Sequence, residues 1–212
     1  MQELEKIDTL EKYKKYISTT HDYKPTILVH ACCAPCSSEV LNEISKAFDI
    51  TIYYYNPNTY PKNEYDKRFH EFSKLPYDFK IINETYDENE YLEKVGDVTG
   101  LKEGSIRCYN CYDLRIERVA RKAKELGFDY FTTTLSISPY KRSKWINELG
   151  LKYQEKYGIN FLYYDFKKND GYKKSIVLSH EYDLYRQEYC GCRYSLDEQE
   201  EKKRKKLEEE AK

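Results

Sequence analysis

The stretch TILVHACCAPCSS, residues 26–38, decides how the rest of the chain is organised. Its first residues, Thr26 to Val29, form an apolar run without polar alternation, which is typical of a strand buried on both faces of a parallel sheet. Three cysteines follow within five residues, and Pro35 and Ser38 suit the start of a helix. The stretch therefore predicts a strand, a cysteine loop and a helix N-terminus in direct succession.

Outside this stretch, apolar runs continue to alternate with segments of helical periodicity. The further runs are 50–55, 79–82, 130–135 and 159–166. Strands that alternate with helices indicate βαβ units with right-handed crossovers. We therefore predict a single Rossmann-like α/β domain with a parallel sheet of roughly five strands. Ligands bind such sheets just outside the carboxyl ends of the strands, where the cysteine loop, the segment 136–140 and Asp165 are all expected.

Two flanking segments are expected to lie outside this body. Residues 1–20 carry apolar side chains at helical spacing, which predicts an N-terminal helical extension. The α/β metal-binding catalytic domain is expected at 21–195. A helix of almost pure charge is expected at 196–212, opened by Ser195-x-x-Glu198, which has the pattern of a capping box.

The bulk properties restrict the setting of the chain. It has 212 residues, a net charge of -1 and no N-terminal apolar segment typical of a signal peptide. No window approaches the roughly 18 apolar residues that span a bilayer, so we expect a cytoplasmic protein with no membrane partner. In a reducing compartment, clustered thiols are more typical of metal ligands or redox catalysts than of structural disulfides. The near-zero charge requires any nucleic-acid partner to be met by a local patch.

The cysteines fall into three groups along the chain. These are Cys32-Cys33-x-x-Cys36, Cys108-x-x-Cys111 and Cys190-Gly191-Cys192. The first resembles a thioredoxin-like dithiol, except that its adjacent third thiol favours ligands to a larger centre. The second has the spacing for one zinc or one iron–sulfur cluster, and the third could chelate a metal or form a reducible disulfide. A closed zinc site takes four ligands, which would leave three of the seven thiols unexplained. The seven thiols therefore favour an iron–sulfur cluster on four of them and a second function for the other three, with a structural zinc as the alternative.

An ordered series of motifs resembles the QueH-type epoxyqueuosine reductases. From about residue 26 to residue 195 the motifs are HACCAPCSSEVL, YYYNPN, EYDKR, RCYNCYDLR, FTTTLSISPYK, DF and LYRQEYCGCRYS. The resemblance implies a cobalamin-independent reduction that removes the epoxide oxygen of epoxyqueuosine at the wobble position of tRNA, with two electrons and two protons. It also implies a [4Fe-4S] cluster and a second, mononuclear iron nearby.

The resemblance also implies roles for individual residues. The cluster is expected on Cys32, Cys33, Cys108 and Cys111, which leaves Cys36, Cys190 and Cys192. Cys190 and Cys192 would either bind the second iron or form a redox-active pair. Asp165 is the expected oxygen ligand of that iron. Asp113 competes for this role, although it is expected more often to cap the helix that follows the second cysteine pair.

Further implied roles concern protons, electrons and tRNA. A free thiol of Cys36 or Cys190, or the hydroxyl of Tyr140, would supply protons. The expected contacts to tRNA phosphates are Arg115, Lys141, Arg142 and Arg186. The wobble nucleotide would be splayed out to reach the site, and an unidentified partner would donate the electrons.

Three other classes use clustered cysteines. A tRNA sulfur-transfer enzyme on a related α/β fold is expected to activate its substrate with ATP, but the sequence has no glycine-rich phosphate loop. A thioredoxin-type oxidoreductase would leave most of the thiols unused. A non-catalytic binding module held together by zinc would be colourless and redox-silent.

Overall fold

The computed structural model describes residues 6–19, 23–98 and 100–210. Within these residues, five parallel strands form one sheet in the order β3-β2-β1-β4-β5. The strands are β1 (Thr26–His30), β2 (Asp49–Tyr54), β3 (Lys80–Asn83), β4 (Tyr130–Thr133) and β5 (Asn160–Phe161). This arrangement confirms the predicted α/β fold. The strand order reverses between β1 and β4, which places the expected ligand crevice after these two strands.

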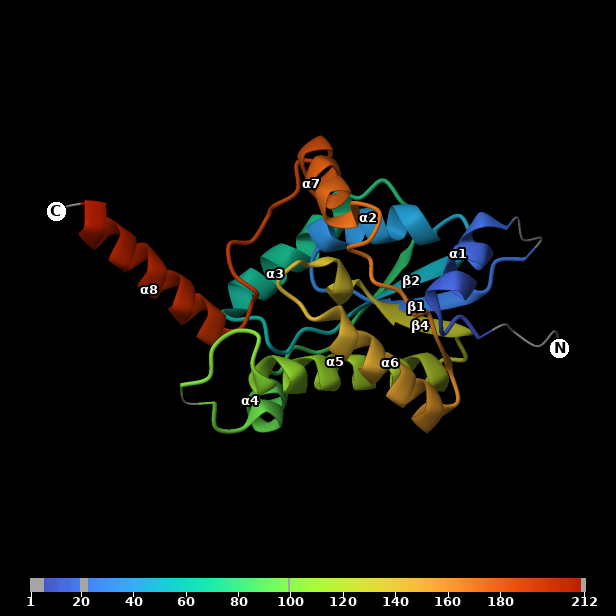
Figure 1. The fold of residues 1–212 in the computed structure, drawn as a ribbon, viewed down its shortest axis with the longest axis horizontal. Helices are drawn as coiled ribbons and strands as arrows, with labels where there is room; N and C mark the ends of the chain where they lie inside the picture. The colour runs from blue at the N-terminus through green and yellow to red at the C-terminus, as the bar shows by residue number, and fades with distance from the viewer. Residues whose placement is uncertain (1–5, 20–22, 99, 211–212) are drawn as a thin grey trace.

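Helices cover both faces of the sheet, as Figure 1 shows. One face carries α1 (Leu10–Ser18), α2 (Ala34–Ile44), α3 (Lys62–His70) and α7 (Gly171–Glu181). The other carries α4 (Glu88–Val95), α5 (Ile106–Glu125) and α6 (Ser143–Tyr157). The central strand explains the two layers, because Ile27 and Val29 belong to the core beneath α2 whereas Leu28 belongs to the core beneath α5.

The fifth strand is shorter than predicted. The apolar run at 159–166 predicts a long strand, but β5 pairs with β4 over two residues only. The amide of Leu162 still donates to the carbonyl of Phe131 in β4 at 2.9 Å, but the next amide, that of Tyr163, donates to the carbonyl of Ile7 at 2.9 Å. Tyr164 stacks on Tyr13 of α1, with ring centroids 3.8 Å apart. The N-terminal segment therefore buries this run, which the sequence pattern attributes to strand pairing.

The helix that carries the second cysteine pair begins earlier than predicted. α5 starts at Ile106, so Cys108 and Cys111 lie in its first turns rather than in a preceding loop. The prediction that Asp113 caps this helix is wrong. Asp113 lies inside α5, and its carboxylate pairs with Lys94 at 2.5 Å and with Lys152 at 3.1 Å. In the sequence Asp113 resembles a helix cap, but in the folded chain it serves as the partner of two lysines that are distant in sequence.

The charged C-terminal helix is present as α8 (Arg193–Glu210) and projects away from the body (Figure 1). The predicted capping box is wrong, because Ser195 lies within the first turn and its hydroxyl donates to the carbonyl of Cys192 at 2.8 Å. Glu198 instead forms a salt bridge with Arg107 of α5 at 2.8 Å. This salt bridge connects the base of α8 to the helix that carries Cys108.

The N-terminal helix is also present, as α1. Thr9 accepts a hydrogen bond from the Lys12 amide at 3.3 Å and so provides the cap. Residues 1–5 and 20 of the predicted extension lie outside the described residues. In the part of the chain that is described, no helix has the length and apolar character needed to cross a bilayer.

Candidate metal and redox centre

The first cysteine group lies between β1 and α2, at the carboxyl edge of the sheet. Cys33 occupies the N-cap position of α2, and Cys36 lies in the first turn. The sulfurs of Cys32 and Cys33 are 3.7 Å apart, and the three sulfurs of this group all lie within 4.8 Å of one another. Among the described residues, this is the only group of three or more potential ligands that is so close together. Cys32, Cys33 and Cys36 could together hold a metal ion.

His30 fixes the start of this loop. Its Nδ1 lies 2.8 Å from the hydroxyl of Thr133, and its Nε2 lies 3.1 Å from the carbonyl oxygen of Tyr55. Because a carbonyl can only accept, we assign the proton to Nε2 and a donated hydrogen bond from Thr133 to Nδ1. Burial lowers the pKa of His30 to about 3, so the ring is neutral. His30 therefore joins the ends of β1, β2 and β4 as a structural residue.

The second and third cysteine groups meet on the α5 side of the sheet. Cys111 and Cys192 pack with Tyr91, Val95 and Val98 in one small buried cluster. The amide of Gly104 donates to the Cys108 sulfur at 3.2 Å. All seven cysteines are free thiols, so the predicted redox pair of Cys190 and Cys192 is not joined by a disulfide here. Burial raises the pKa of Cys111, and the charges of Cys190, Cys192 and Cys108 raise it further. The fold thus brings together four thiols from two distant segments.

A buried arginine that the sequence did not reveal positions the third group. Arg68 of α3 pairs with Glu64 at 2.8 Å, and its guanidinium donates to the carbonyls of Cys190 at 3.1 Å and Tyr189 at 3.4 Å. Gly191 lies directly against it, with φ of +135°. In the sequence Arg68 resembles a surface residue with an i,i+4 carboxylate partner. Only the folded chain places it behind the cysteine pair.

Replacing Gly191 with alanine should disrupt this arrangement. The added Cβ would lie 2.8 Å from Nη1 of Arg68, which cannot move freely because Glu64 holds it. We expect Gly191→Ala to lower the free energy of unfolding by about 2–3 kcal/mol and to reduce the amount of metal that the purified protein retains. Gly127→Ala is the matched control, since its φ is also positive at +75° but nothing lies within 4 Å. Equal losses in the two variants, measured by urea unfolding, would contradict the role of Arg68.

Two buried cations lie next to thiols of the three cysteine groups. Lys141 follows η2 (Thr134–Ile137) and is 9% exposed, and Arg115 of α5 is 2% exposed. Burial alone would lower the pKa of Lys141, but the negative charge of Cys190, Cys32 and Cys36 outweighs burial and raises that pKa. Burial likewise disfavours the charged form of Arg115, whose pKa is nevertheless raised by Cys111, Cys190 and Cys32.

The thiols themselves differ in their preferred charge. Hydrogen bonds from Cys33 and Cys36, together with Lys141 and Arg115, hold the pKa of Cys32 well below its ordinary value. Burial raises the pKa of Cys190 to about 11 and that of Cys111 to about 12. Without a metal, therefore, one thiolate is favoured beside two buried cations.

The metal-free centre thus has two buried cations but only one favoured thiolate, and this charge imbalance indicates what the centre can bind. Nη2 of Arg115 is buried and has no hydrogen-bond partner among the described residues. An unpaired buried cation is costly, and the surrounding thiols become anionic when they bind a metal. The residues present therefore fit a metal centre with several thiolate ligands.

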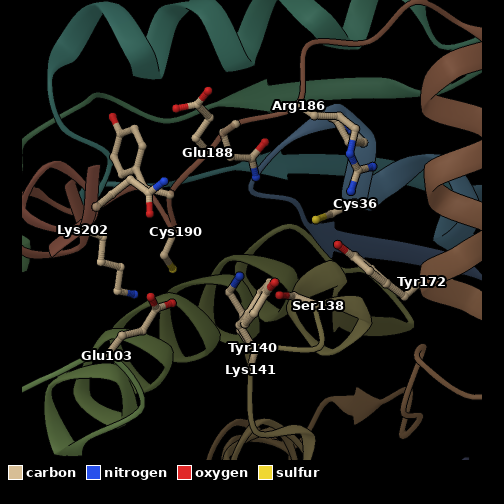
Figure 2. Close-up of a pocket in the computed structure, with 14 residues that line it drawn as sticks. Cys36, Glu103, Ser138, Tyr140, Lys141, Tyr172, Arg186, Glu188, Cys190 and Lys202 are labelled. Atoms are coloured by element: carbon tan, nitrogen blue, oxygen red, sulfur yellow. The ribbon is translucent and has the colours of Figure 1, made fainter. Parts of the chain in front are cut away.

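A pocket of about 280 Å³ opens onto this centre. Figure 2 shows Cys36 and Cys190 on opposite sides of it, with Lys141 and Tyr140 below and Arg186 beside Cys36. These five residues were expected from the sequence. Pro35 and Ser138 belong to segments expected at this edge of the sheet, whereas the lining residues that sequence reasoning missed are Glu103, Tyr172, Gln187, Glu188, Tyr189, Gln199 and Lys202. Gln199 and Lys202 come from α8, which was expected to be a solvated helix.

Arg142 and Asp165, which were also expected in the site, lie outside this pocket lining. Arg142 lies over the ring of Trp145, 4.3 Å from its centroid. Asp165 pairs with Lys167 at 3.2 Å and accepts a hydrogen bond from Ser143 at 2.8 Å. These partners occupy the oxygens of Asp165, and its role as an iron ligand stays a prediction.

Gln187 is a missed residue that contacts a sulfur directly. Its Nε2 lies 3.2 Å from the Cys33 sulfur, while its Oε1 is buried without a hydrogen-bond partner among the described residues. An amide can donate to a thiolate, so Gln187 suits Cys33 in its metal-binding form. No spacing or motif indicates this contact, because it joins residues from opposite ends of the chain.

The fold and the site together define an α/β protein with a thiol-rich centre, able to bind metal, at the carboxyl edge of a parallel sheet. Residues 27–198 match the family model described as epoxyqueuosine reductase QueH. The chain belongs to this family.

Individual relatives of the same name are similar over most of the chain. The protein from Streptococcus pyogenes is 42% identical over 180 residues, which cover 81% of this chain and 71% of the relative. The protein from Staphylococcus aureus is 39% identical over 186 residues, covering 83% and 78%. The protein from Thermotoga maritima is 38% identical over 183 residues, covering 84% and 93%. Each of these relatives is named epoxyqueuosine reductase QueH.

Proposed function

We propose that this chain is an oxidoreductase that reduces epoxyqueuosine to queuosine at the wobble position of tRNA. Two electrons and two protons remove the epoxide oxygen as water and leave a carbon–carbon double bond. The observation that carries the proposal is the family match, which includes all seven cysteines within residues 27–198. The enzyme acts in the cytoplasm, without cobalamin, and takes its electrons from a separate donor.

The proposed cofactors are a [4Fe-4S] cluster and a second iron. When bound, they supply single electrons and a Lewis acid. The charge of the site supports this proposal, because Arg115 and Lys141 lie buried among thiols from three segments of the chain. Four thiolates on one cluster would give these cations the anionic partner that the free thiols do not provide.

Two assignments of the thiols are possible. The one expected from the resemblance places the cluster on Cys32, Cys33, Cys108 and Cys111. The second follows the contacts of the folded chain and places it on Cys108, Cys111, Cys190 and Cys192. Packing of Cys111 against Cys192 favours the second assignment. The close group of Cys32, Cys33 and Cys36 then serves the second iron.

The residues around the pocket would hold the substrate and deliver protons. Cys36 and Cys190 border the pocket. The pKa of each thiol is raised, so either of them stays protonated near neutral pH as long as it binds no metal. These thiols and Cys192 keep the catalytic roles expected from the resemblance only where they bind no metal, since the second assignment places Cys190 and Cys192 on the cluster and Cys36 at the second iron. Tyr140, the other proton donor expected from the resemblance, also lines the pocket.

Contacts to tRNA are proposed for the basic residues. Arg186 and Lys141 line the pocket, so they can meet a phosphate or an oxygen of the splayed nucleotide. Arg142 lies outside the pocket lining and would contact a neighbouring phosphate. Arg115 is too deeply buried for a backbone phosphate, and we assign it instead to balancing the charge of the thiolates.

A direct assay tests the proposed reaction. Protein reconstituted anaerobically with iron and sulfide is incubated with dithionite and an anticodon stem-loop RNA that contains epoxyqueuosine. We expect the modified nucleoside to lose one oxygen atom, as measured by mass spectrometry. ATP-dependent incorporation of sulfur would instead support the sulfur-transfer class, and a colourless protein with one zinc and no turnover would support the binding module.

A further inference from the structure

The segment after η2 presents two consecutive side chains in different surroundings. The amide of Lys141 donates to the carbonyl of Ser138 at 3.2 Å, which closes a tight turn containing Pro139 and Tyr140. The side chain of Lys141 is buried next to the thiols, whereas Tyr140 is 75% exposed. Both residues line the pocket (Figure 2). The turn therefore places a cation at the floor of the pocket and an aromatic ring at its mouth.

The Tyr140 ring is exposed to solvent rather than packed in the core. Among the described residues, no aromatic ring or cation is stacked on it, although most tyrosines near the site are buried or paired. A single exposed aromatic is ordinary on a protein surface. This one differs because it borders a pocket that contains thiols and a buried lysine, and because Arg142 lies two residues further along the chain.

We propose that Tyr140 is a stacking platform for an unpaired RNA base next to the wobble nucleotide; this inference rests on the proposed function. A nucleotide can reach the pocket only if it leaves the stack of the anticodon loop, which exposes the face of its neighbour. An exposed ring beside basic residues is the combination that binds single-stranded RNA. Arg142, two residues further along the chain, and Arg186 in the pocket lining provide positive charge for the flanking phosphates.

This role replaces proton donation as the function of Tyr140. A proton donor must lie within hydrogen-bond reach of the reacting oxygen, and the reacting carbons must lie near the thiols at the floor. The exposed phenol is at the mouth, in contact with water. Tyr140 therefore acts through its ring rather than through its hydroxyl.

Two substitutions separate ring from hydroxyl. We expect Tyr140→Ala to weaken binding of the anticodon stem-loop RNA about tenfold and to raise KM by a similar factor, while kcat changes much less. Tyr140→Phe, which keeps the ring, should restore both affinity and KM. Binding is measured by fluorescence anisotropy with the same RNA carrying an unmodified guanosine, so the test does not require turnover. The fluorescence of 2-aminopurine next to the wobble position should be quenched by the wild-type protein and by Tyr140→Phe, but not by Tyr140→Ala.

The matched control is Tyr23→Ala, which removes another exposed ring, 61% exposed, just before β1 at the opposite edge of the sheet. It should leave RNA affinity unchanged. A loss of kcat in Tyr140→Phe as large as in Tyr140→Ala would overturn the proposal in favour of proton donation. Unchanged RNA affinity in Tyr140→Ala would overturn it as well. If the wild-type protein binds the RNA through Tyr140 but does not reduce epoxyqueuosine, the proposed reaction fails and the stacking role stands.

Discussion

Replacing Cys192 with alanine should abolish the visible absorption of the reconstituted protein, remove its acid-labile sulfide and stop turnover. Replacing Cys33 should also stop turnover but leave the absorption and the sulfide in place, with only part of the iron lost. The contrast is expected if the cluster is held by Cys108, Cys111, Cys190 and Cys192. Cys192 packs with Cys111, whereas Cys33 lies with Cys32 and Cys36. Loss of a thiolate ligand removes a cluster that three remaining thiolates hold poorly.

The two variants discriminate between the assignments of the thiols. If the cluster is held by Cys32, Cys33, Cys108 and Cys111, the results for Cys33→Ala and Cys192→Ala are exchanged. Cys108→Ala is the reference, because both assignments predict loss of the cluster. The measurements are an anaerobic ultraviolet–visible spectrum, iron and sulfide analysis, and a melting curve that confirms folding of each variant. A Cys108 variant with full colour and full activity would refute both assignments.

Replacing Arg115 with methionine should have opposite effects on the two forms of the protein. In the metal-free form we expect the free energy of unfolding to rise by about 1–3 kcal/mol, because the substitution removes a buried charge whose Nη2 has no partner among the described residues. In the proposed metal-loaded form the same charge would stabilise the anionic ligands. We therefore expect the loaded variant to lose its cluster faster and to turn over at least about tenfold more slowly than the wild type.

Arg118→Met is the control for this opposite behaviour. Arg118 lies on the same helix, but its guanidinium pairs with Glu90 at 2.8 Å and stacks on Tyr55, 4.4 Å from the ring centroid. Its loss should lower the stability of both forms by a similar amount. Urea unfolding of the metal-free proteins and the rate of cluster release to a chelator measure the two quantities. A metal-free Arg115→Met protein that is less stable than the wild type would contradict the proposed charge imbalance.

The parts of the fold predicted from the sequence are those with strong local patterns. The apolar run before Cys32 and the Pro35 that follows predicted β1 and the start of α2 because each signal acts over a few residues. Ser38, which suits a helix cap in the sequence, instead lies inside α2, and Cys33 occupies the N-cap position. Predictions failed where a distant partner changed the meaning of a local signal. Asp113 resembles a helix cap but is paired with Lys94 and Lys152, and no residue close to it in sequence announces that partnership.

The candidate site divides in the same way. The sequence by itself determined that seven thiols exist, that the first group follows a central strand, and that the fold places this group at the ligand-binding edge. Only the tertiary structure decided which thiols are neighbours, and that Arg68, Arg115 and Lys141 are buried among them. The physical reason is that burial and charge compensation depend on packing between α3, α5 and the segment before α8, and a lysine or arginine has the same appearance in the sequence whether it faces water or a thiolate.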